Sequence, residues 1–549
     1  MQRDLNALAE TSFDVVVIGG GIYGAFTAWD AARRGLSVAL IEQGDWGGAT
    51  SSNSLKIAHG GLRYLQSADF KRMRESIRER RILMAMAPHL VHPMACMLPT
   101  LGHFSRGPEA MAAAMLLNDF VGSDRDQGLD AAHKLPPGGV ISREEAMRRI
   151  PGVSTGGLTG AACWYDGLIH NPDRLVLAVV ASAVDAGAVA ANHLEATGVL
   201  MDGGRVAGVT ATDRLDGGAI EIRARVTLNC AGPWANRVLG LARPDAAPLV
   251  QWSWAMNLVT RRVGTHEAFA VWSPYRITNG KRVRRPKPQA LFVVPWRDVT
   301  IIGTMHRPHP GPGGAFAPGA TQVDDFIDEI NHAWPGVDLT RRDVKLPLAG
   351  LLPMTGMQGN GEVGLSDRAV IVDHGAHGLP GLISTVGVKF TTSRNVAERL
   401  VNAAFAALGT KTPPPCTTTT ATVHGGDVGD WPAFVAAARA EVGDAPWLEQ
   451  LLRSHGSRWR DVLADLDRPF DSVADVDILE AQAAHAVRHE MAHTLADVVR
   501  RRTELGSAGA PGREPLARMA AVMACQMGWD AASAADQVNG VHALYGFPS

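Results

Sequence analysis

Three glycines near the N-terminus have the spacing that brings a peptide backbone against a phosphate. Gly19, Gly21 and Gly24 form a G-x-G-x-x-G motif directly after an apolar run. The first glycine permits a tight turn, the second lets the backbone approach a pyrophosphate, and the third lets a helix pack closely on a strand. Glu42 follows a second apolar run, where a carboxylate can accept hydrogen bonds from ribose hydroxyls. This pattern predicts a dinucleotide-binding unit; the alternative is an ordinary glycine-rich turn.

A strand, a helix and a second strand must hold these residues in place. The β-branched run Asp14–Ile18 predicts a strand that is buried on both faces of a parallel sheet. Ala25–Arg34 predicts an alanine-rich helix whose N-terminal amides would face the phosphates. Gly35 ends this helix, and Ser37–Ile41 predicts the second strand, with Glu42 at its end.

A loop rich in hydroxyl groups follows, from Gly44 to Leu65, with the sequence GDWGGATSSNSLKIAHGGLRYL. Its glycine content argues against a regular helix or strand. Backbone amides and the hydroxyls of Thr50, Ser51, Ser52 and Ser54 suit it to wrap phosphates and a polar ring. We therefore predict that this loop contacts the cofactor.

Together with the glycine motif, the segments TSS-x-S-x-K and HGGLRYL resemble the FAD-dependent glycerol-3-phosphate dehydrogenases. Two later segments also match this family: TLNCAGPWA, from Thr227 to Ala235, and GLISTVGVKFTTSR, from Gly381 to Arg394. The resemblance implies FAD as the cofactor, with His59–Leu62 beside the flavin ring. It implies that the cofactor contacts Gly19, Gly21, Ile22, Tyr23, Gly24, Glu42, Gln43, Thr50, Ser51, Ser52, Asn53, Ser54, Lys56, His59, Gly60, Gly61, Leu62, Ala231, Gly232, Trp234, Gly387, Lys389, Phe390 and Thr391.

The resemblance also implies a fold class and a division into domains. We expect an α/β flavoprotein with a doubly wound, glutathione-reductase-like FAD domain, an antiparallel-sheet substrate domain and a helical C-terminal cap. The expected FAD domain is discontinuous and comprises residues 11–90, 155–240 and 350–410. The substrate domain would comprise residues 91–154 and 241–349, and the cap residues 411–549.

The predicted substrate site departs from the family pattern. Trp254 stands where family members have a histidine, Leu352 replaces an arginine, and the family's G-T-T-D is G-T-M-H here, ending at His306. An arginine can bind a phosphate with two hydrogen bonds, whereas a leucine cannot. The predicted substrate-binding residues are Arg63, Tyr64, Trp254, Leu352, Arg368 and Lys389, and the predicted catalytic residues are Arg63, Lys389 and His306.

The resemblance implies hydride transfer from a secondary alcohol carbon to flavin N5. The substrate would be glycerol 3-phosphate or a related phosphorylated polyol, with quinone or oxygen as the electron acceptor. One alternative is the same flavin machinery acting on a different hydroxy or amino substrate, because the histidine and arginine are replaced. Another is a flavin-binding protein without turnover.

A metalloprotease motif, HEMAH at His489–His493, has the H-E-x-x-H form. On a helix its two histidines would lie one turn apart and could bind zinc. We interpret the match as a coincidence and predict no metal, because the continuation TLADVVRRRTELG resembles a family segment in which Glu490 and Asp497 pack against arginines.

The composition excludes several other classes. The 549 residues carry a formal net charge of −2, which gives no reason to expect nucleic acid as a partner. The five cysteines are scattered and lack a C-x-x-C motif, as in reduced cytoplasmic proteins. We expect a cytoplasmic homo-oligomer, with possible peripheral contact at the inner face of the cytoplasmic membrane. The basic segment Ser67–Ala87 is either a solvated helix face or a contact with an anionic membrane. The basic segment Lys281–Lys287, expected as a loop, is either solvated surface or a contact with anionic lipid or a partner.

Overall fold

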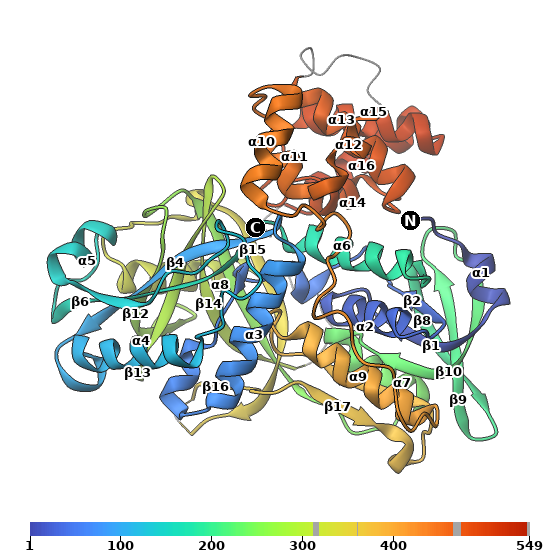
Figure 1. Ribbon diagram of the computed structural model, residues 1–549, viewed down its shortest axis with the longest axis horizontal. Coiled ribbons are helices and arrows are strands. Elements are labelled where there is room, and N and C mark those ends of the chain that lie inside the picture. The colour runs from blue at the N-terminus through green and yellow to red at the C-terminus, as the bar shows by residue number, and fades with distance from the viewer. Residues whose placement is uncertain (311–317, 360, 465–473, 546–549) are drawn as a thin grey trace.

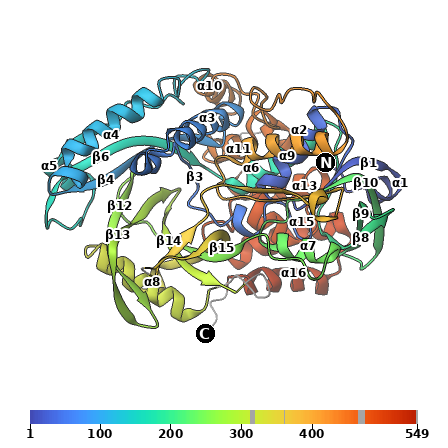
Figure 2. The same cartoon turned by 90° about the horizontal axis from the view of Figure 1, so that it is seen from below.

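The computed structural model describes residues 1–310, 318–359, 361–464 and 474–545. It contains two large sheets side by side, with a group of helices from the C-terminal part of the chain above them (Figure 1). Seen from below, the second sheet with helices α4 and α8 lies beside the first sheet with α1 and α7 (Figure 2). The doubly wound fold with a helical C-terminal region is the expected architecture.

The first sheet contains the predicted dinucleotide-binding unit. Its strands run in the order β17-β18-β10-β1-β2-β7, and β1 pairs in parallel with both β10 and β2. Strands β8 and β9 extend it on one side as an antiparallel hairpin. The strands are β1 (Ser12–Ile18), β2 (Val38–Ile41), β7 (Val189–Ala191), β8 (Leu194–Asp202), β9 (Arg205–Asp213), β10 (Ala219–Asn229), β17 (Val370–Asp373) and β18 (Leu382–Val386).

Helix α2 (Ile22–Arg33) packs on this sheet between α6 (Pro172–Asp185) and α9 (Ser393–Ala407). A Cβ atom on Gly24 would lie 1.8 Å from the carbonyl oxygen of Gly19. The third glycine of the motif therefore lets helix and strand approach closely, as predicted. The other helices before the cap are α1 (Leu5–Glu10), α3 (Phe70–Met86), α4 (Pro108–Val121), α5 (Arg143–Arg149), α7 (Ala235–Ala242) and α8 (Ala320–Ala333).

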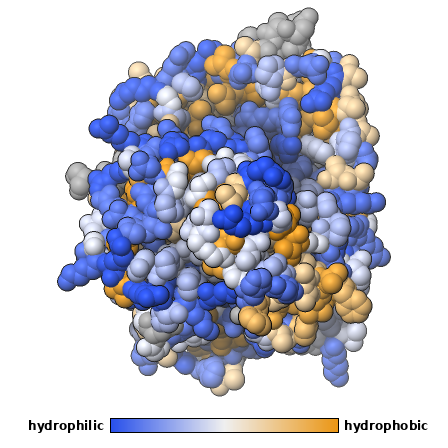
Figure 3. Space-filling model, turned by 90° about the vertical axis from the view of Figure 1, so that its left-hand side faces the viewer, coloured by the Kyte–Doolittle hydropathy of each residue, from blue (hydrophilic) through white to orange (hydrophobic). Residues whose placement is uncertain are grey.

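The second sheet is mostly antiparallel, with strand order β16-β15-β11-β14-β13-β12-β4-β6-β3. Helix α8 packs against β12. The face of the molecule on this side is mostly hydrophilic, with hydrophobic side chains grouped in patches (Figure 3). The strands are β3 (Ile57–Ala58), β4 (Val91–Leu101), β5 (Gly139–Ser142), β6 (Leu158–Ile169), β11 (Gln251–Arg261), β12 (Ala268–Thr278), β13 (Lys281–Trp296), β14 (Val299–His309), β15 (Val344–Met357) and β16 (Val363–Leu365).

Two expectations about this sheet need correction. Strands β3, β6, β15 and β16 belong to the second sheet, although the expected boundaries placed most of their residues in the FAD domain. The three-part division itself stays a prediction. The basic segment Lys281–Lys287 is the start of β13 and not a loop. The expected proline- and glycine-rich loop at Gly311–Gly319 lies mostly outside the described residues.

The helical cap begins at Trp431, after a connection without helix or strand from α9. Its helix α13 ends at His489, because the chain turns away to place Glu490 against Arg174. The expected continuous helix through HEMAH is therefore wrong, and His493 lies beyond the helix end. The cap elements are α10 (Trp431–Val442), α11 (Leu448–His455), α12 (Trp459–Leu463), α13 (Asp475–His489), α14 (Leu495–Asp497), the π-helical segment η9 (Val498–Arg502), α15 (Arg513–Met527) and α16 (Ala531–Ala543).

Candidate active site

A cavity of about 650 Å³ lies between the two sheets. The glycine motif and the hydroxyl-rich loop form one part of its wall, and strands β11, β14 and β15 form another. The segment 385–391, which begins in the last residues of β18, also lines the cavity. Cavities of this size and with a mostly apolar wall are typical of cofactor and substrate sites.

The glycine motif prepares one end of the cavity for a dinucleotide. Gly19 has φ = +107°, and a Cβ atom there would lie 2.7 Å from the carbonyl oxygen of Cys230. The amide of Ile22, at the start of α2, donates a hydrogen bond of 3.1 Å to the Ser51 hydroxyl. A helix N-terminus that faces a cavity with small residues and hydroxyls fits a pyrophosphate.

Glu42 closes the same end of the cavity. Its carboxylate accepts hydrogen bonds from the amides of Gly20 at 2.7 Å and Gly44 at 2.9 Å. Burial raises the pKa of Glu42 despite these bonds. The amides fix its position, and its free lone pairs can still accept from ribose hydroxyls.

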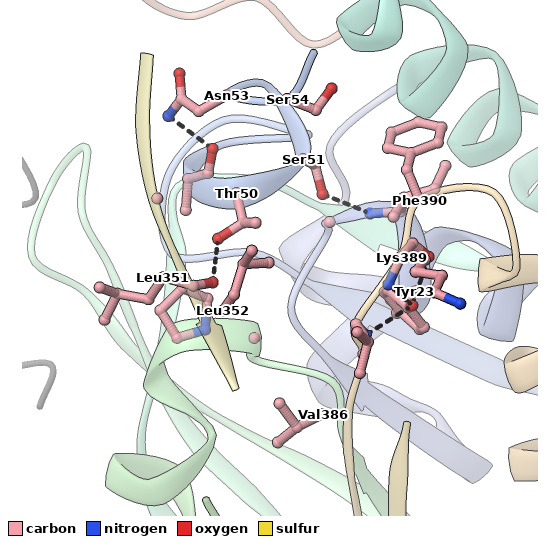
Figure 4. Close-up of a pocket in the computed structure, with 18 of the residues that line it drawn as sticks. Tyr23, Thr50, Ser51, Asn53, Ser54, Leu351, Leu352, Val386, Lys389 and Phe390 are labelled. Carbon is pink, nitrogen blue, oxygen red and sulfur yellow. Dashed lines mark hydrogen bonds between the residues drawn. The ribbon is translucent and has the colours of Figure 1, made fainter. Parts of the chain in front are cut away.

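Tyr23 fixes the segment after β18. Its hydroxyl donates to the carbonyl oxygen of Lys389 at 2.6 Å and accepts from the amides of Val388 at 3.1 Å and Lys389 at 3.0 Å (Figure 4). Burial raises the pKa of Tyr23 to about 12, so the hydroxyl keeps its proton. A Cβ atom on Gly387 would lie 1.9 Å from the Tyr23 ring. Gly387 thus lets this segment pack closely against Tyr23, and its predicted contact with the flavin stays a prediction.

Two cations face the cavity. The Lys389 ammonium lies 4.0 Å from the centre of the Tyr64 ring, and Arg63 also lines the cavity. Burial and the nearby charge of Arg63 lower the pKa of Lys389 to about 8. Neither cation forms an ion pair with a carboxylate of the described part of the chain. The site can therefore hold an anionic group.

Two histidines in the lining are neutral at pH 7. Burial lowers the pKa of His59 to about 4, and burial together with Arg63 lowers that of His306 to about 4. The Nδ1 atom of His306 is buried and has no hydrogen-bond partner among the described residues. His306 can thus accept a proton, although the low pKa makes it a weak base.

The buried side chains of Asp166 and Arg174 hold other segments of the chain in place. The Asp166 carboxylate accepts from the amide of Gly60 at 2.6 Å and from Arg80 at 2.7 Å. Arg174 donates to both oxygens of Glu490 at 2.8 Å, and this pair joins α6 to the cap. With an arginine bound to its central carboxylate, the HEMAH segment lacks the arrangement of a zinc protease site.

Most of the predicted site residues line the cavity, and their contacts with cofactor and substrate stay predictions. Six predicted residues lie outside the lining. Trp254 packs in the core of the second sheet, Arg368 is exposed, and the buried Lys56 lies 5.2 Å from the centre of the Trp296 ring. The other three are Gly24, Ser52 and Gly60, whose roles are in packing and backbone position: Ser52 donates to Asp173, and Gly60 lies against Arg80.

Sequence reasoning missed part of the opposite wall. Asn257 on β11 donates to the carbonyl oxygen of Asn53 at 3.3 Å and accepts from the Thr304 hydroxyl of β14 at 2.8 Å. Arg501 of the cap also lines the cavity. A single polar residue in an alternating strand carries no motif, so no sequence signal marked Asn257, whereas Thr304 lies in the G-T-M-H segment that ends at His306.

Comparison with known proteins identifies the family. A family model for FAD dependent oxidoreductases matches residues 14–393, and one for the C-terminal domain of alpha-glycerophosphate oxidase matches residues 416–534. The chain belongs to the FAD-dependent oxidoreductase family. Its cofactor is accordingly FAD, and the cavity fits this cofactor through its glycine turn, helix N-terminus and Glu42.

Several similar proteins within this family are named glycerol-3-phosphate dehydrogenase. A glycerol-3-phosphate dehydrogenase of Synechocystis sp. is 30% identical, over 98% of this chain and 97% of the relative. One of Mycobacterium leprae is 31% identical, over 94% and 86%. The structure of glycerol-3-phosphate dehydrogenase from Bacillus halodurans, complexed with FAD, has a TM-score of 0.74 at 24% identity, over 98% and 95%. The chain is thus a member of the glycerol-3-phosphate dehydrogenase family, and the resemblance seen in the sequence is confirmed.

Proposed function

We propose that this enzyme oxidises the secondary alcohol carbon of glycerol 3-phosphate or of a closely related phosphorylated polyol. The observation that supports the substrate class is the pair of cations, Arg63 and Lys389, on one wall of the cavity without carboxylate partners. Relatives named glycerol-3-phosphate dehydrogenase at 30–31% identity favour this substrate over a different hydroxy or amino compound.

In this proposal each residue has a defined task. Arg63 and Lys389 bind the phosphate and thereby orient the substrate. The neutral His306 accepts the hydroxyl proton, and Tyr23 holds the Lys389 backbone in position. When bound, FAD would supply a hydride acceptor at N5, and quinone or oxygen would be the final electron acceptor.

Leu352 makes this site different from the family pattern. It lines the cavity, where the family arginine would add a second phosphate contact. Binding of the substrate's phosphate would therefore depend more strongly on Arg63 and Lys389. We also propose that the enzyme works in the cytoplasm and contacts an anionic membrane surface through exposed cations at the start of β13. No described helix is long and apolar enough to cross a membrane.

Anaerobic reduction of the bound flavin tests the substrate class. The FAD-loaded enzyme is mixed with glycerol 3-phosphate, glycerol and a panel of amino acids, and the visible absorbance of the flavin is followed. We expect bleaching by glycerol 3-phosphate, and a KM at least about tenfold higher for Arg63→Met because a charge-assisted hydrogen bond is lost. Arg106→Met, an exposed arginine outside the cavity, is the control. Bleaching by an amino acid and by no phosphorylated polyol would support the alternative substrate and contradict the proposal.

A further inference from the structure

The cap contributes an arginine to the cavity wall. Arg501 lies in the π-helical segment η9, and its side chain is 15% exposed. It reaches the loop that follows Glu42, where a Cβ atom on Gly48 would lie 3.7 Å from its guanidinium. This loop leads directly to Ser51, whose hydroxyl binds the amide of Ile22 at the N-terminus of α2.

No neighbouring carboxylate in the described structure forms a hydrogen bond with Arg501. Asp45 is the nearest carboxylate, and both of its oxygens accept from the fully buried Arg502, at 2.5 and 2.8 Å. The Arg501 guanidinium lies 3.6 Å from Asp45, which is longer than a hydrogen bond. Its Nε atom is buried without a hydrogen-bond partner in the described structure. A buried donor without a partner is costly, so a ligand group is expected to accept from it.

We propose that Arg501 binds the pyrophosphate of FAD, so that the cap completes the cofactor site. The guanidinium and the amides at the start of α2 lie beside the same loop, and both favour phosphate oxygens. Arg502 serves as the positioning residue: its bonds to Asp45 and to the carbonyl oxygen of Glu490 fix η9 against the loop.

This arrangement couples cofactor binding to the position of the cap. Glu490 also binds Arg174 of α6, so two buried ion pairs hold the cap to the rest of the chain: one precedes η9, and the other is formed by Arg502 at the end of η9. FAD that contacts Arg501 then stabilises the docked cap by mass action. The inference depends on FAD as the cofactor and does not depend on the identity of the substrate.

Binding of FAD and of its fragments to the apoprotein tests the proposal. We compare Arg501→Met with the wild type and with Arg518→Met, which removes a surface arginine of the cap that pairs with Glu480. The Kd values of FAD and ADP should rise about 10- to 100-fold in R501M, as expected for a lost charge-assisted hydrogen bond, whereas that of riboflavin, which lacks phosphate, should stay within about twofold. R518M should bind all three ligands like the wild type.

Two results would overturn the proposal. Unchanged FAD and ADP affinity in R501M would show that Arg501 does not bind the pyrophosphate, and equal weakening for riboflavin would show a purely structural role. If R501M does not fold, Arg501→Lys decides the question, because lysine keeps the charge but lacks the planar guanidinium that can bind a phosphate with two nitrogens. We then expect an ADP Kd about threefold or more above the wild-type value, with riboflavin unchanged. Equal ADP affinity of R501K and the wild type would contradict the proposal.

Discussion

In the function proposed above, Lys389 supplies a positive charge for the substrate phosphate, but its buried position makes this charge easier to lose. Burial and the neighbouring Arg63 lower its pKa to about 8. The substrate phosphate, with a second pKa of about 6, is doubly charged above pH 7. Between pH 7 and 9.5 the anion therefore keeps its charge while the lysine loses its own.

The pH dependence of KM follows from this difference. As the pH rises through about 8, the charged fraction of Lys389 falls, so the KM for glycerol 3-phosphate should rise roughly tenfold by pH 9 to 9.5. In Lys389→Arg the side chain stays charged, and KM should change by less than about twofold over the same range. Steady-state kinetics of both enzymes measure this. A wild-type KM that is flat up to pH 9.5 would show that Lys389 does not bind the phosphate.

At this scale a larger share of the predicted cofactor residues than of the predicted substrate residues lines the cavity. The glycines act through backbone geometry, and the Glu42 carboxylate follows β2 directly, so a local motif records both. Trp254 was assigned to the site from its place in a family pattern, but the structure places its side chain in the core of the second sheet. The direction of a strand side chain depends on register, which the single sequence does not fix.

At the scale of elements, the segment that begins β13 shows where sequence patterns fail. Pro286 and Pro288 suggested a loop, because proline cannot donate in a sheet. In the structure β13 pairs with β12 on both sides of a bulge: Ser273 lies opposite Gln289, and Tyr275 lies opposite Arg284. Both prolines fall inside this bulge, where no ladder hydrogen bond is required.

Strand β13 carries four exposed basic side chains, namely Lys281, Arg282, Arg284 and Lys287. None of them forms an ion pair with a residue that the structure describes, and Val283 between them is 46% exposed. Unpaired cations around an exposed apolar residue suit an anionic bilayer surface, where each charge contributes about 1 kcal/mol. This is the surface by which we propose membrane contact.

Charge reversal on this strand should weaken vesicle binding. In co-sedimentation with vesicles that contain phosphatidylglycerol, the double variant Lys281→Glu/Arg284→Glu should have an affinity at least about tenfold lower than the wild type, because electrostatic attraction becomes repulsion. Arg223→Glu, an exposed arginine on β10 of the first sheet, is the control and should bind like the wild type. Equal binding to neutral and anionic vesicles would contradict an electrostatic contact.

At the scale of the whole molecule, the cavity joins residues that are hundreds of positions apart. Local patterns predicted the βαβ unit, because periodicity and glycine spacing are local, and the family resemblance implied the helical cap. They could not predict that Asn257 reaches the loop of Asn53 or that Arg501 enters from the cap. Such contacts depend on how the two sheets and the cap pack together.

This packing also buries histidines, with a consequence for stability. Burial lowers the pKa of His59 and His306 to about 4 and that of His89 to about 3. Unfolded histidines titrate near pH 6.5, so below this pH the unfolded chain binds more protons than the folded chain. His193 opposes this trend: burial alone would lower its pKa, but its hydrogen bond to Asp497 raises it overall.

The FAD-loaded enzyme should therefore lose stability between about pH 6.5 and 4. Each buried neutral histidine adds a slope of about 1.4 kcal/mol per pH unit to the free energy of unfolding in the lower part of this range. Urea unfolding at several pH values measures the slope. His89→Gln should reduce this slope by about the contribution of one histidine, about 1.4 kcal/mol per pH unit. His103→Gln, at a side chain that is 68% exposed, should leave the slope unchanged. A free energy of unfolding that stays constant from pH 6.5 to 4.5 would mean that these histidines become charged within the folded protein, and the cavity would then offer the substrate protonated histidines instead of a neutral base.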